Sequence, residues 1–324
     1  MKIFEKKKED NRRTFYIFGK KVLSYKKKQS KYDKIYAKRF KGLTRQEERY
    51  ILEVQFERMA GYKLNLDNPQ TFNEKIQWLK HNYRDPLMTK CADKVRVREY
   101  IKEKIGEDYL IPCLGVYNSP EEIDFDKLPD RFVLKVNWGS GQNIIVKDKS
   151  KLNTEEVKEK LKNWMKPESN HYFNFLEWVY KDIEPKIITE KYIEQMDGNL
   201  IDYKFFCNCG KPVFLFLGID RFIDTKFNFY DLNWNLLPVK NHYKNCTREI
   251  PKPKNFEKML QISEKLSVDF PFVRVDLFEI ENKIYFGELT FYHFNGTEPF
   301  EPFKWDYKFG ELIELQKRSN NEPF

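Results

Sequence analysis

Cysteine is scarce in this chain of 324 residues, which contains five, spread between positions 91 and 246. Cysteines so few and so scattered do not form the disulfide framework of a small secreted protein, and we expect a reducing, cytoplasmic compartment. Long apolar runs are missing too, and the longest near the N-terminus is residues 15–18 (FYIF). A membrane-spanning helix needs about 20 apolar residues, so we expect neither a transmembrane segment nor a secretory leader.

Two common kinds of site lack their sequence signatures. Cys207 and Cys209 lie two residues apart, but no second Cys or His pair follows at the spacing of zinc ligands. No Gly-x-x-x-x-Gly-Lys sequence exists, so nothing indicates a P-loop nucleotide site. The four histidines are isolated in the sequence. Only His293 follows other candidate site residues, and both a general-base role and a packing role stay open for it.

Aromatic residues are abundant, at 16% of the chain, and apolar residues make up 40%. This is too much apolar surface for a disordered chain, and the length suits one large domain or two modest ones. Charge is distributed unevenly along the sequence. Residues 1–45 contain 17 Lys and Arg against 4 Asp and Glu, a net charge of +13, whereas the whole chain carries +9. The remaining body is therefore mildly acidic.

The basic segment supports three interpretations. Its lysines can form a solvated or helix-packed face without a partner, attach the chain to the inner face of an anionic membrane, or bind nucleic acid. Aromatic residues between the lysines suit a membrane interface. Nothing further along the chain resembles a module that reads DNA or RNA, so we expect no nucleic acid partner. We expect residues 1–50 to form a helical basic arm.

The pattern beyond residue 50 predicts an α+β body with mainly antiparallel sheets. Thr71 and Glu74 have the spacing of a capping box, and Asn153 is expected to cap another helix. Strand-like runs occur in pairs around turn residues. The expected helices are residues 75–79, 92–104, 154–165 and 256–266. The expected strands are residues 131–137, 143–147, 187–193, 203–207, 213–219, 227–230, 236–239, 273–280 and 284–290.

A glycine-rich turn follows one of these strands. Glycine is rare, with 13 in the chain, yet Gly139 and Gly141 flank Ser140 shortly after Lys135. A turn of bare backbone N–H groups can close over phosphate oxygens, and a lysine supplies a point charge. Such a turn is also an ordinary hairpin connection, so this motif alone leaves both interpretations open.

The last predicted hairpin brings charged residues to one face. By strand alternation Arg274 and Asp276 point to the same side, as does Glu288 on the partner strand. Charges among apolar neighbours need a counter-ion. Mg²⁺ fits, because it takes one or two carboxylates together with nucleotide phosphates and water. A buried ion network without a metal is the alternative.

A third candidate element lies between the glycine-rich turn and the last hairpin. An acidic strand end at residues 190–193 leads into a connecting segment and then Asp202, which together offer backbone groups and carboxylates to an adenine and a ribose.

The order of these elements resembles the ATP-grasp superfamily. Within it, residues 62–314 are similar to the TupA-like ATP-grasp family, named for teichuronopeptide synthesis. The motifs that carry the resemblance are residues 71–79 (TFNEKIQWL), 92–100 (ADKVRVREY), 132–141 (FVLKVNWGSG), 202–206 (DYKFF), 228–234 (NFYDLNW), 272–276 (FVRVD) and 285–290 (YFGELT).

The resemblance implies two α+β lobes with mainly antiparallel sheets that clasp ATP. It places a catalytic domain at residues 51–324, with a lid lobe at about 131–190 and a C-terminal metal-binding lobe at about 191–315. It also implies a role for each matching residue. These are Lys94 and Lys135 at the nucleotide; Gly139, Ser140 and Gly141 as the lid; Glu190, Lys191 and Ile193 as the adenine-facing hinge; Asp202 at the ribose; Lys204 and Arg274 as cations at the transferring phosphoryl group; and Asp276 and Glu288 as Mg²⁺ ligands. Thr290 stands where the superfamily often has a metal-binding Asn.

The reaction implied by the resemblance is ATP-dependent ligation. ATP phosphorylates a carboxylate, and an amine then displaces phosphate to form an amide. The family's link with surface polysaccharides suggests a uronic acid or an amino acid on a saccharide, and the basic arm would suit a lipid-linked acceptor.

Three alternatives stay open: a glycosyltransferase that uses Asp124 and Asp126, a sugar or lipid kinase with the same fold, and a non-catalytic, membrane-associated scaffold protein. Trp138 and His293 depart from the family pattern on the substrate side.

Overall fold

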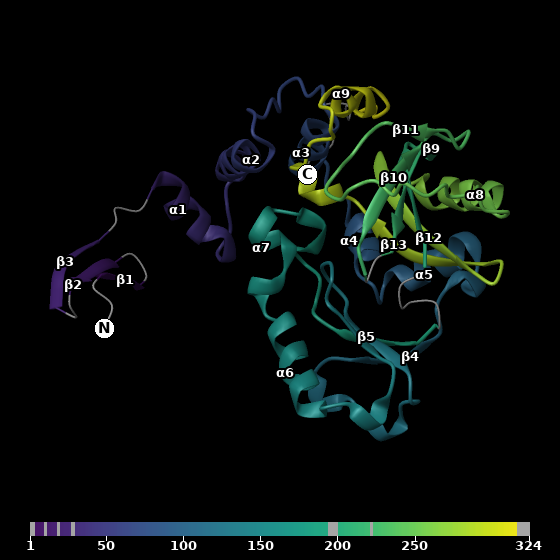
Figure 1. The fold of residues 1–324 in the computed structure, drawn as a ribbon, viewed down its shortest axis with the longest axis horizontal. Coiled ribbons are helices and arrows are strands. Elements are labelled where there is room, and N and C mark those ends of the chain that lie inside the picture. The colour runs from purple at the N-terminus through teal and green to yellow at the C-terminus, as the bar shows by residue number, and fades with distance from the viewer. Residues whose placement is uncertain are drawn as a thin grey trace. The chain divides into compact units, whose positions relative to one another are not determined.

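The computed structural model describes residues 4–9, 12–17, 20–26, 30–193, 200–220 and 223–315. The chain divides into two compact units, Met1–Val54 and Gln55–Phe324. Both are drawn in Figure 1, where the first unit is purple to dark blue. In the described part of the chain, no helix has both the length and the apolar character needed to cross a bilayer.

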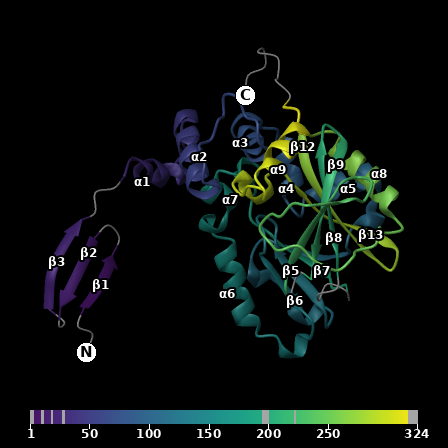
Figure 2. The same ribbon diagram turned by 45° about the horizontal axis from the view of Figure 1, so that its top comes forward.

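The first unit begins with strands and continues with helices. Strands β1 (Phe4–Glu9), β2 (Arg12–Ile17) and β3 (Lys20–Lys26) form an antiparallel sheet, seen side by side in Figure 2. Helix α1 (Lys31–Tyr36) and the 3₁₀ helix η1 (Ala37–Phe40) follow. The expectation of a helical arm is therefore wrong for residues 4–9, 12–17 and 20–26. Residues 14–17 (TFYI) are aromatic and β-branched, and such residues favour strands.

Two helices of the second unit begin at the caps predicted from the sequence. Thr71 and Glu74 form the capping box of α3, and the Asn153 side chain accepts from the backbone N–H of Glu156 at the start of α6. The helix expected at 92–104 begins later, because Asp93 Oδ1 accepts from the backbone N–H groups of Val95 and Arg96. The helices are α2 (Arg45–Ala60), which contains the unit boundary, α3 (Phe72–Asn82), α4 (Pro86–Ala92), α5 (Val97–Ile105), α6 (Thr154–Trp164), α7 (His171–Phe175), α8 (Phe256–Ser267) and α9 (Lys304–Glu311).

Two antiparallel sheets form the second unit, which confirms the α+β fold class. The smaller sheet has the order β4-β7-β5-β6, made of β4 (Cys113–Tyr117), β5 (Phe132–Val136), β6 (Asn143–Val146) and β7 (Ile187–Lys191). The larger sheet has the order β11-β10-β9-β8-β12-β13. Its strands are β8 (Asp202–Asn208), β9 (Lys211–Ile219), β10 (Lys226–Tyr230), β11 (Leu236–Leu237), β12 (Phe272–Ile280) and β13 (Lys283–Thr290).

Helices cover both faces of the larger sheet, and strand alternation decides which residues they bury. Phe205 of β8 contacts Phe256 of α8 on one face. The next residue, Phe206, points to the other face and contacts Phe72 of α3 with ring centroids 5.6 Å apart. Lys204 lies two residues before Phe206 and therefore shares its face. A lysine and the aromatic core thus occupy the same side of one strand.

Candidate active site

A cavity of about 350 Å³ lies between the two sheets of the second unit. Strands β5 and β7 of the smaller sheet contribute to one side of it, and strands β8, β12 and β13 of the larger sheet contribute to the other. The predicted site residues that line it are Lys94, Lys135, Gly139, Ser140, Gly141, Glu190, Asp202, Lys204, Asp276 and Glu288. Folding therefore brings together positions that are spread over much of the sequence.

Three neighbouring strands place charged side chains in one row across the larger sheet. Asp276 of β12 pairs in register with Lys204 of β8 on one side and with Glu288 of β13 on the other. Residues directly opposite each other in an antiparallel pair point to the same face. The ammonium group of Lys204 donates to Asp276 Oδ2, and its Nζ lies 3.4 Å from Oδ2 of Asp202. One cation is therefore held among carboxylates at the cavity wall.

Arg274, two residues before Asp276 on β12, donates hydrogen bonds to both carboxylates of this row, Asp276 and Glu288. Its Nε and Nη2 donate to the two oxygens of Asp276, each at 2.7 Å, and Nη2 lies 3.1 Å from Oε1 of Glu288. Thr290 Oγ1 accepts from Nη2 and donates to Glu288 Oε1, both at 2.9 Å. Arg274 and Thr290 do not line the cavity themselves; they orient the carboxylates that do.

Glu288 is strongly held in its charged form. Burial favours the neutral carboxyl group, but Lys204, Arg274 and Lys94 outweigh it and keep the pKa of Glu288 far below its usual value. Lys94 belongs to the segment between α4 and α5, not to the sheet. Its influence on Glu288 means that the two sides of the cavity act on one another electrostatically.

The carboxylates of Asp276 and Glu288 suit a magnesium ion, because Mg²⁺ prefers oxygen and commonly takes only one or two protein carboxylates. Thr290, the third predicted ligand, does not line the cavity, and its hydroxyl is bonded to Arg274 and Glu288. A carboxylate can accept about four hydrogen bonds or metal contacts. Among the described residues, Arg274 and Thr290 both donate to Oε1 of Glu288, so its Oε2 can bind another partner. No cluster of three or more acidic, His or Cys metal ligands occurs in the described ranges, so phosphate and water would have to complete the coordination.

His293 supports Arg274 and is not available as a general base. It is 1% exposed, in the 3₁₀ helix η9 (His293–Gly296). Its Nδ1 is 2.7 Å from Nη1 of Arg274, and its Nε2 is 3.2 Å from Oδ1 of Asn241. Since a guanidinium only donates, Nδ1 accepts and Nε2 donates. Burial and the neighbouring Arg274 cation lower the pKa of His293 well below its usual value. The packing interpretation of this histidine is correct.

The opposite side of the cavity contains the other predicted cations. Nζ of Lys135 on β5 is 2.6 Å from Oε2 of Glu190 on β7, and Arg98 contacts Oε1 of the same carboxylate at 3.1 Å. Nζ of Lys94 donates to the carbonyl oxygen of Gly139 at 2.7 Å. Gly139 has φ of +72°, a value that favours glycine. A lysine is therefore bonded to the backbone of the glycine turn.

A family model described as TupA-like ATPgrasp matches residues 74–314 of this sequence. The chain belongs to the TupA-like ATP-grasp family. ATP-grasp proteins are ATP-dependent carboxylate–amine ligases, and membership places this chain among enzymes of that class. The match covers both sheets of the second unit and every predicted site residue. A search of curated proteins finds no match.

Solved structures similar to this ATP-grasp chain are distant relatives. D-alanine–D-alanine ligase from Helicobacter pylori is 16% identical, with a TM-score of 0.40, over 76% of this chain and 70% of that chain. D-cycloserine synthetase DcsG is 14% identical, with a TM-score of 0.38, over 81% and 82%. D-alanine–D-alanine ligase from Bacillus anthracis, complexed with ATP, is 19% identical, with a TM-score of 0.34, over 62% and 53%. The family match, not these structures, carries the assignment.

The predicted hinge of the ATP-grasp domain is only partly brought to the cavity. Glu190 lines it, but the Lys191 side chain is exposed and does not, and the Lys191 backbone N–H donates to Pro112 at 3.0 Å. Ile193 is half-buried against an apolar cluster that contains Ile111 and Leu200. Residues 194–199, which continue the expected hinge, lie outside the described residues.

Several residues of the ATP-grasp cavity were not predicted from the sequence. Arg98 was missed, although it follows Lys94 by one helical turn and the spacing was available as a signal. Tyr180, at the end of the 3₁₀ helix η7 (Trp178–Tyr180), was missed because no local pattern marks it. The apolar lining was also missed, since its members resemble ordinary core residues: Ile111, Val133, Ile145, Leu200, Leu277, Phe278, Phe286 and Leu289.

The acidic pair considered for a glycosyltransferase lies away from the ATP-grasp cavity. Asp124 caps the 3₁₀ helix η4 (Phe125–Lys127), where its side chain accepts from the Asp126 backbone N–H. Its other contact is a surface ion pair with Lys127 at 3.0 Å. Neither aspartate lines the cavity. A turn-capping role accounts for Asp124.

Proposed function

We propose that this chain uses ATP and Mg²⁺ to activate a carboxylate as an acyl phosphate and joins it to an amine. One observation carries the proposal beyond family membership: a row of Lys204, Asp276 and Glu288 faces Lys94, Lys135 and a glycine turn across a single cavity. Phosphoryl transfer needs little more than positioning and charge neutralisation. Cations and oxygen ligands on opposite walls of one cavity can supply both.

The position of each residue in the cavity suggests which part of ATP or which ion it would bind. Lys94 and Lys135 would contact the phosphates from the side of the smaller sheet, and the backbone N–H groups of the glycine turn would close over them. Lys204, with Arg274 behind it, would neutralise charge on the transferring phosphoryl group. Asp276 and Glu288 would hold Mg²⁺, oriented by Thr290 and Arg274. Bound there, the ion would supply Lewis-acid stabilisation of negative charge on the phosphate oxygens.

The adenine and ribose would occupy the apolar part of the same cavity. Val133 and Ile145 belong to the smaller sheet, whereas Leu200 and Phe278 lie on the side of the larger sheet. Flat apolar walls suit a purine ring, and Glu190 and Asp202 also line the cavity. Ile193 would contribute to the hinge through backbone groups, whereas the Lys191 N–H is already bonded to Pro112.

The substrates we propose are a uronic acid or amino acid carboxylate on a cell-surface polysaccharide or its precursor, and an amine. The family's connection with surface polymers suggests this class. The test is a screen of glucuronate and galacturonate against α-amino acids, with ADP and phosphate release as signals. We expect phosphate release to require ATP, Mg²⁺, a carboxylate and an amine together. ADP formation with a phosphorylated sugar and no free phosphate would indicate a kinase and contradict the proposal.

We propose that the basic residues 1–45 attach the enzyme to the inner face of an anionic membrane, near a lipid-linked acceptor. Their net charge of +13 supports this, since each basic residue near such a surface contributes about 1 kcal/mol. We expect the full chain to float with vesicles that contain anionic lipids, and to lose this binding in high salt. Deletion of residues 1–45 should abolish flotation. Equal flotation of the deleted chain would contradict the proposal.

A further inference from the structure

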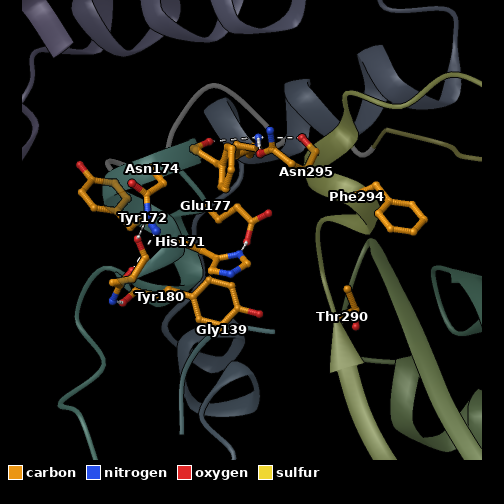
Figure 3. A network of polar contacts seen from close by, with 12 residues as sticks. Gly139, His171, Tyr172, Asn174, Glu177, Tyr180, Thr290, Phe294 and Asn295 are labelled. Carbon is orange, nitrogen blue, oxygen red and sulfur yellow. Dashed lines mark hydrogen bonds and ion pairs between the residues drawn. The ribbon is translucent and has the colours of Figure 1, made fainter. Parts of the chain in front are cut away.

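A histidine and a glutamate form a pair at the glycine turn, outside the residues assigned above. Nδ1 of His171, the first residue of α7, is 3.1 Å from Oε2 of Glu177. The Glu177 side chain is 7% exposed, whereas that of His171 is 26% exposed. Figure 3 shows the two side chains facing each other, with Tyr180 beside them. A buried carboxylate therefore holds one edge of a partly accessible imidazole.

The other edge of the imidazole faces the lid. A Cβ atom built on Gly139 would lie 3.4 Å from Nε2 of His171 and 3.3 Å from its Cδ2. Gly139 lines the cavity, and so does Tyr180, whose ring lies 5.6 Å from that of His171. Among the described residues, the His171 ring makes one hydrogen bond, between Nδ1 and Glu177. His171 does not itself line the cavity, but its Nε2 accepts no hydrogen bond from the described residues and lies beside Gly139, which does line it.

The segment that carries the pair is fixed at both ends. Asn170 donates to the carbonyl oxygen of Tyr180 at 2.8 Å and accepts from the backbone of Tyr172, which closes the loop between these residues. Lys80 of α3, fully buried, donates to Phe175 at 3.2 Å and to the carbonyl oxygen of Asn295 in η9 at 2.9 Å. Lys80 thus ties the loop to the segment that follows β13. The pair is preorganised rather than assembled by a mobile side chain.

The charges around His171 favour its protonated form. Burial lowers the pKa of His171, but the hydrogen bond and charge of Glu177 raise it, and the pKa stands above its usual value. Lys94 on the segment before α5 and Glu288 on β13 also act on it, in opposite directions, and Tyr180 packs against the ring. Histidine is the side chain that most often exchanges protons in catalysis, and a nearby carboxylate makes the imidazole a stronger base.

We propose that His171 is the base that deprotonates the amine substrate, with Glu177 as its positioning residue. The inference rests on the proposed ligase function and locates the amine at the rim of the cavity, beside the glycine turn and Tyr180. An amine arrives as an ammonium ion, which has no lone pair and cannot attack. Nε2 of His171 takes one proton, and the freed nitrogen attacks the acyl phosphate carbon. The C–N bond forms, the C–O bond to phosphate breaks, and the second nitrogen proton leaves with phosphate.

Glu177 would act as the carboxylate of a catalytic triad acts. Its hydrogen bond at Nδ1 selects the tautomer with the lone pair on Nε2 and stabilises the imidazolium that forms. Tyr180 and Phe175, with ring centroids 5.6 and 5.9 Å from His171, hold the imidazole plane. This arrangement leaves His171 as the group that contacts the substrate. The carboxylate and the ATP phosphates would bind deeper, at Lys135 and Lys204.

The test compares two amines on the same acyl phosphate. Glucuronate or galacturonate serves as the carboxylate, and the amines are hydroxylamine and the α-amino acid selected in the screen above. Hydroxylamine is a much weaker base than an alkylamine, is already neutral at neutral pH, and needs no base to attack. For His171→Gln we expect amide formation with the amino acid to fall by about 10²–10⁴-fold. Hydroxamate formation should be unchanged.

The pH profile and a matched pair separate this role from a structural one. In the wild-type enzyme, kcat/KM for the amino acid should fall at acidic pH as His171 becomes protonated, and Glu177→Gln should shift that limb to lower pH. His242→Gln is the control, because His242 forms a similar pair with Glu298 at 2.7 Å on the surface. We expect it to keep both activities.

Each outcome of this experiment decides between specific accounts. Equal losses of hydroxamate and amide in His171→Gln would make His171 a carboxylate-binding or structural residue and overturn the proposal. Unchanged amide formation would overturn it as well. If the wild-type enzyme forms no hydroxamate with any carboxylate, the ligase function itself fails, and this result is distinct from the other two.

Discussion

Replacing Glu288 with glutamine is expected to reduce ATP turnover by about 10²–10³-fold, the loss typical of removing one electrostatic group from a reaction centre. Glutamine has nearly the same shape but no charge, so it would remove one of the negative charges that act on Lys94, Lys204 and Arg274. It would also remove one of the two carboxylates proposed to hold Mg²⁺. The measurement is phosphate release with saturating ATP as Mg²⁺ is varied. We expect half-saturation to move to higher Mg²⁺ concentration.

A control variant tests whether turnover depends on the carboxylate at the cavity or on any carboxylate of the same sheet. Glu279 lies on β12, three residues after Asp276, but its side chain accepts from Asn255 at 2.7 Å and does not line the cavity. Glu279→Gln should therefore keep turnover and its Mg²⁺ dependence. If Glu288→Gln and Glu279→Gln behave alike, Glu288 has no role in metal or phosphate binding.

The second large effect is expected for Arg274→Lys, which keeps the positive charge. A guanidinium spans several acceptors in a fixed plane, and lysine cannot reproduce this geometry. The change would leave part of Asp276, Glu288 and the His293 acceptor without donors in a buried setting. We expect turnover to fall by about 10²-fold or more, and the free energy of unfolding to fall by about 1–3 kcal/mol. Turnover and urea denaturation measure the two effects.

Arg248 provides the control for this substitution. It pairs with Asp220 at 3.0 Å, and its side chain is 56% exposed. Exposed ion pairs contribute about 0–1 kcal/mol, so Arg248→Lys should change neither stability nor turnover measurably. Wild-type stability and activity in Arg274→Lys would mean that a point charge suffices and that the hydrogen-bond network is incidental.

Much of the larger sheet could be predicted because its signals are local. Turn residues separate the strands, and alternation alone places Arg274 and Asp276 on one face. The exact pairing could not be predicted. Gly287 is an extra residue in β13, which makes Asp276 face Glu288 while Leu277 faces Phe286. A Cβ at Gly287 would lie 3.0 Å from the Asp276 carbonyl oxygen, so glycine is favoured there, but a glycine within a strand does not by itself indicate a bulge.

The site was predictable where charge and glycine stand out in the sequence, and not where contacts are long-range. Lys135 and the glycine turn are conspicuous, and the cavity contains them. His171 and Glu177 lie in a short segment without periodicity, and only the folded chain brings them beside Gly139. His293 lies close to β13 in sequence, which made it a candidate general base. In the fold, however, its Nδ1 accepts a hydrogen bond from Arg274.

The first unit shows how composition can mislead about secondary structure. The expectation for residues 1–50 is a helical basic arm. The aromatic and β-branched residues between the lysines favour strands, and β1, β2 and β3 form there. Charge thus indicated a basic surface without indicating its backbone conformation.

A crystal structure of the full chain with Mg²⁺ and a non-hydrolysable ATP analogue tests the central claim most directly. The account predicts the triphosphate between the turn at Gly139 and the row formed by Lys204, Asp276 and Glu288, with the metal bound to both carboxylates. The adenine should lie against the apolar lining near Leu200. Nucleotide bound elsewhere, with Asp276 and Glu288 still bonded only to Arg274 and Lys204, would contradict the account.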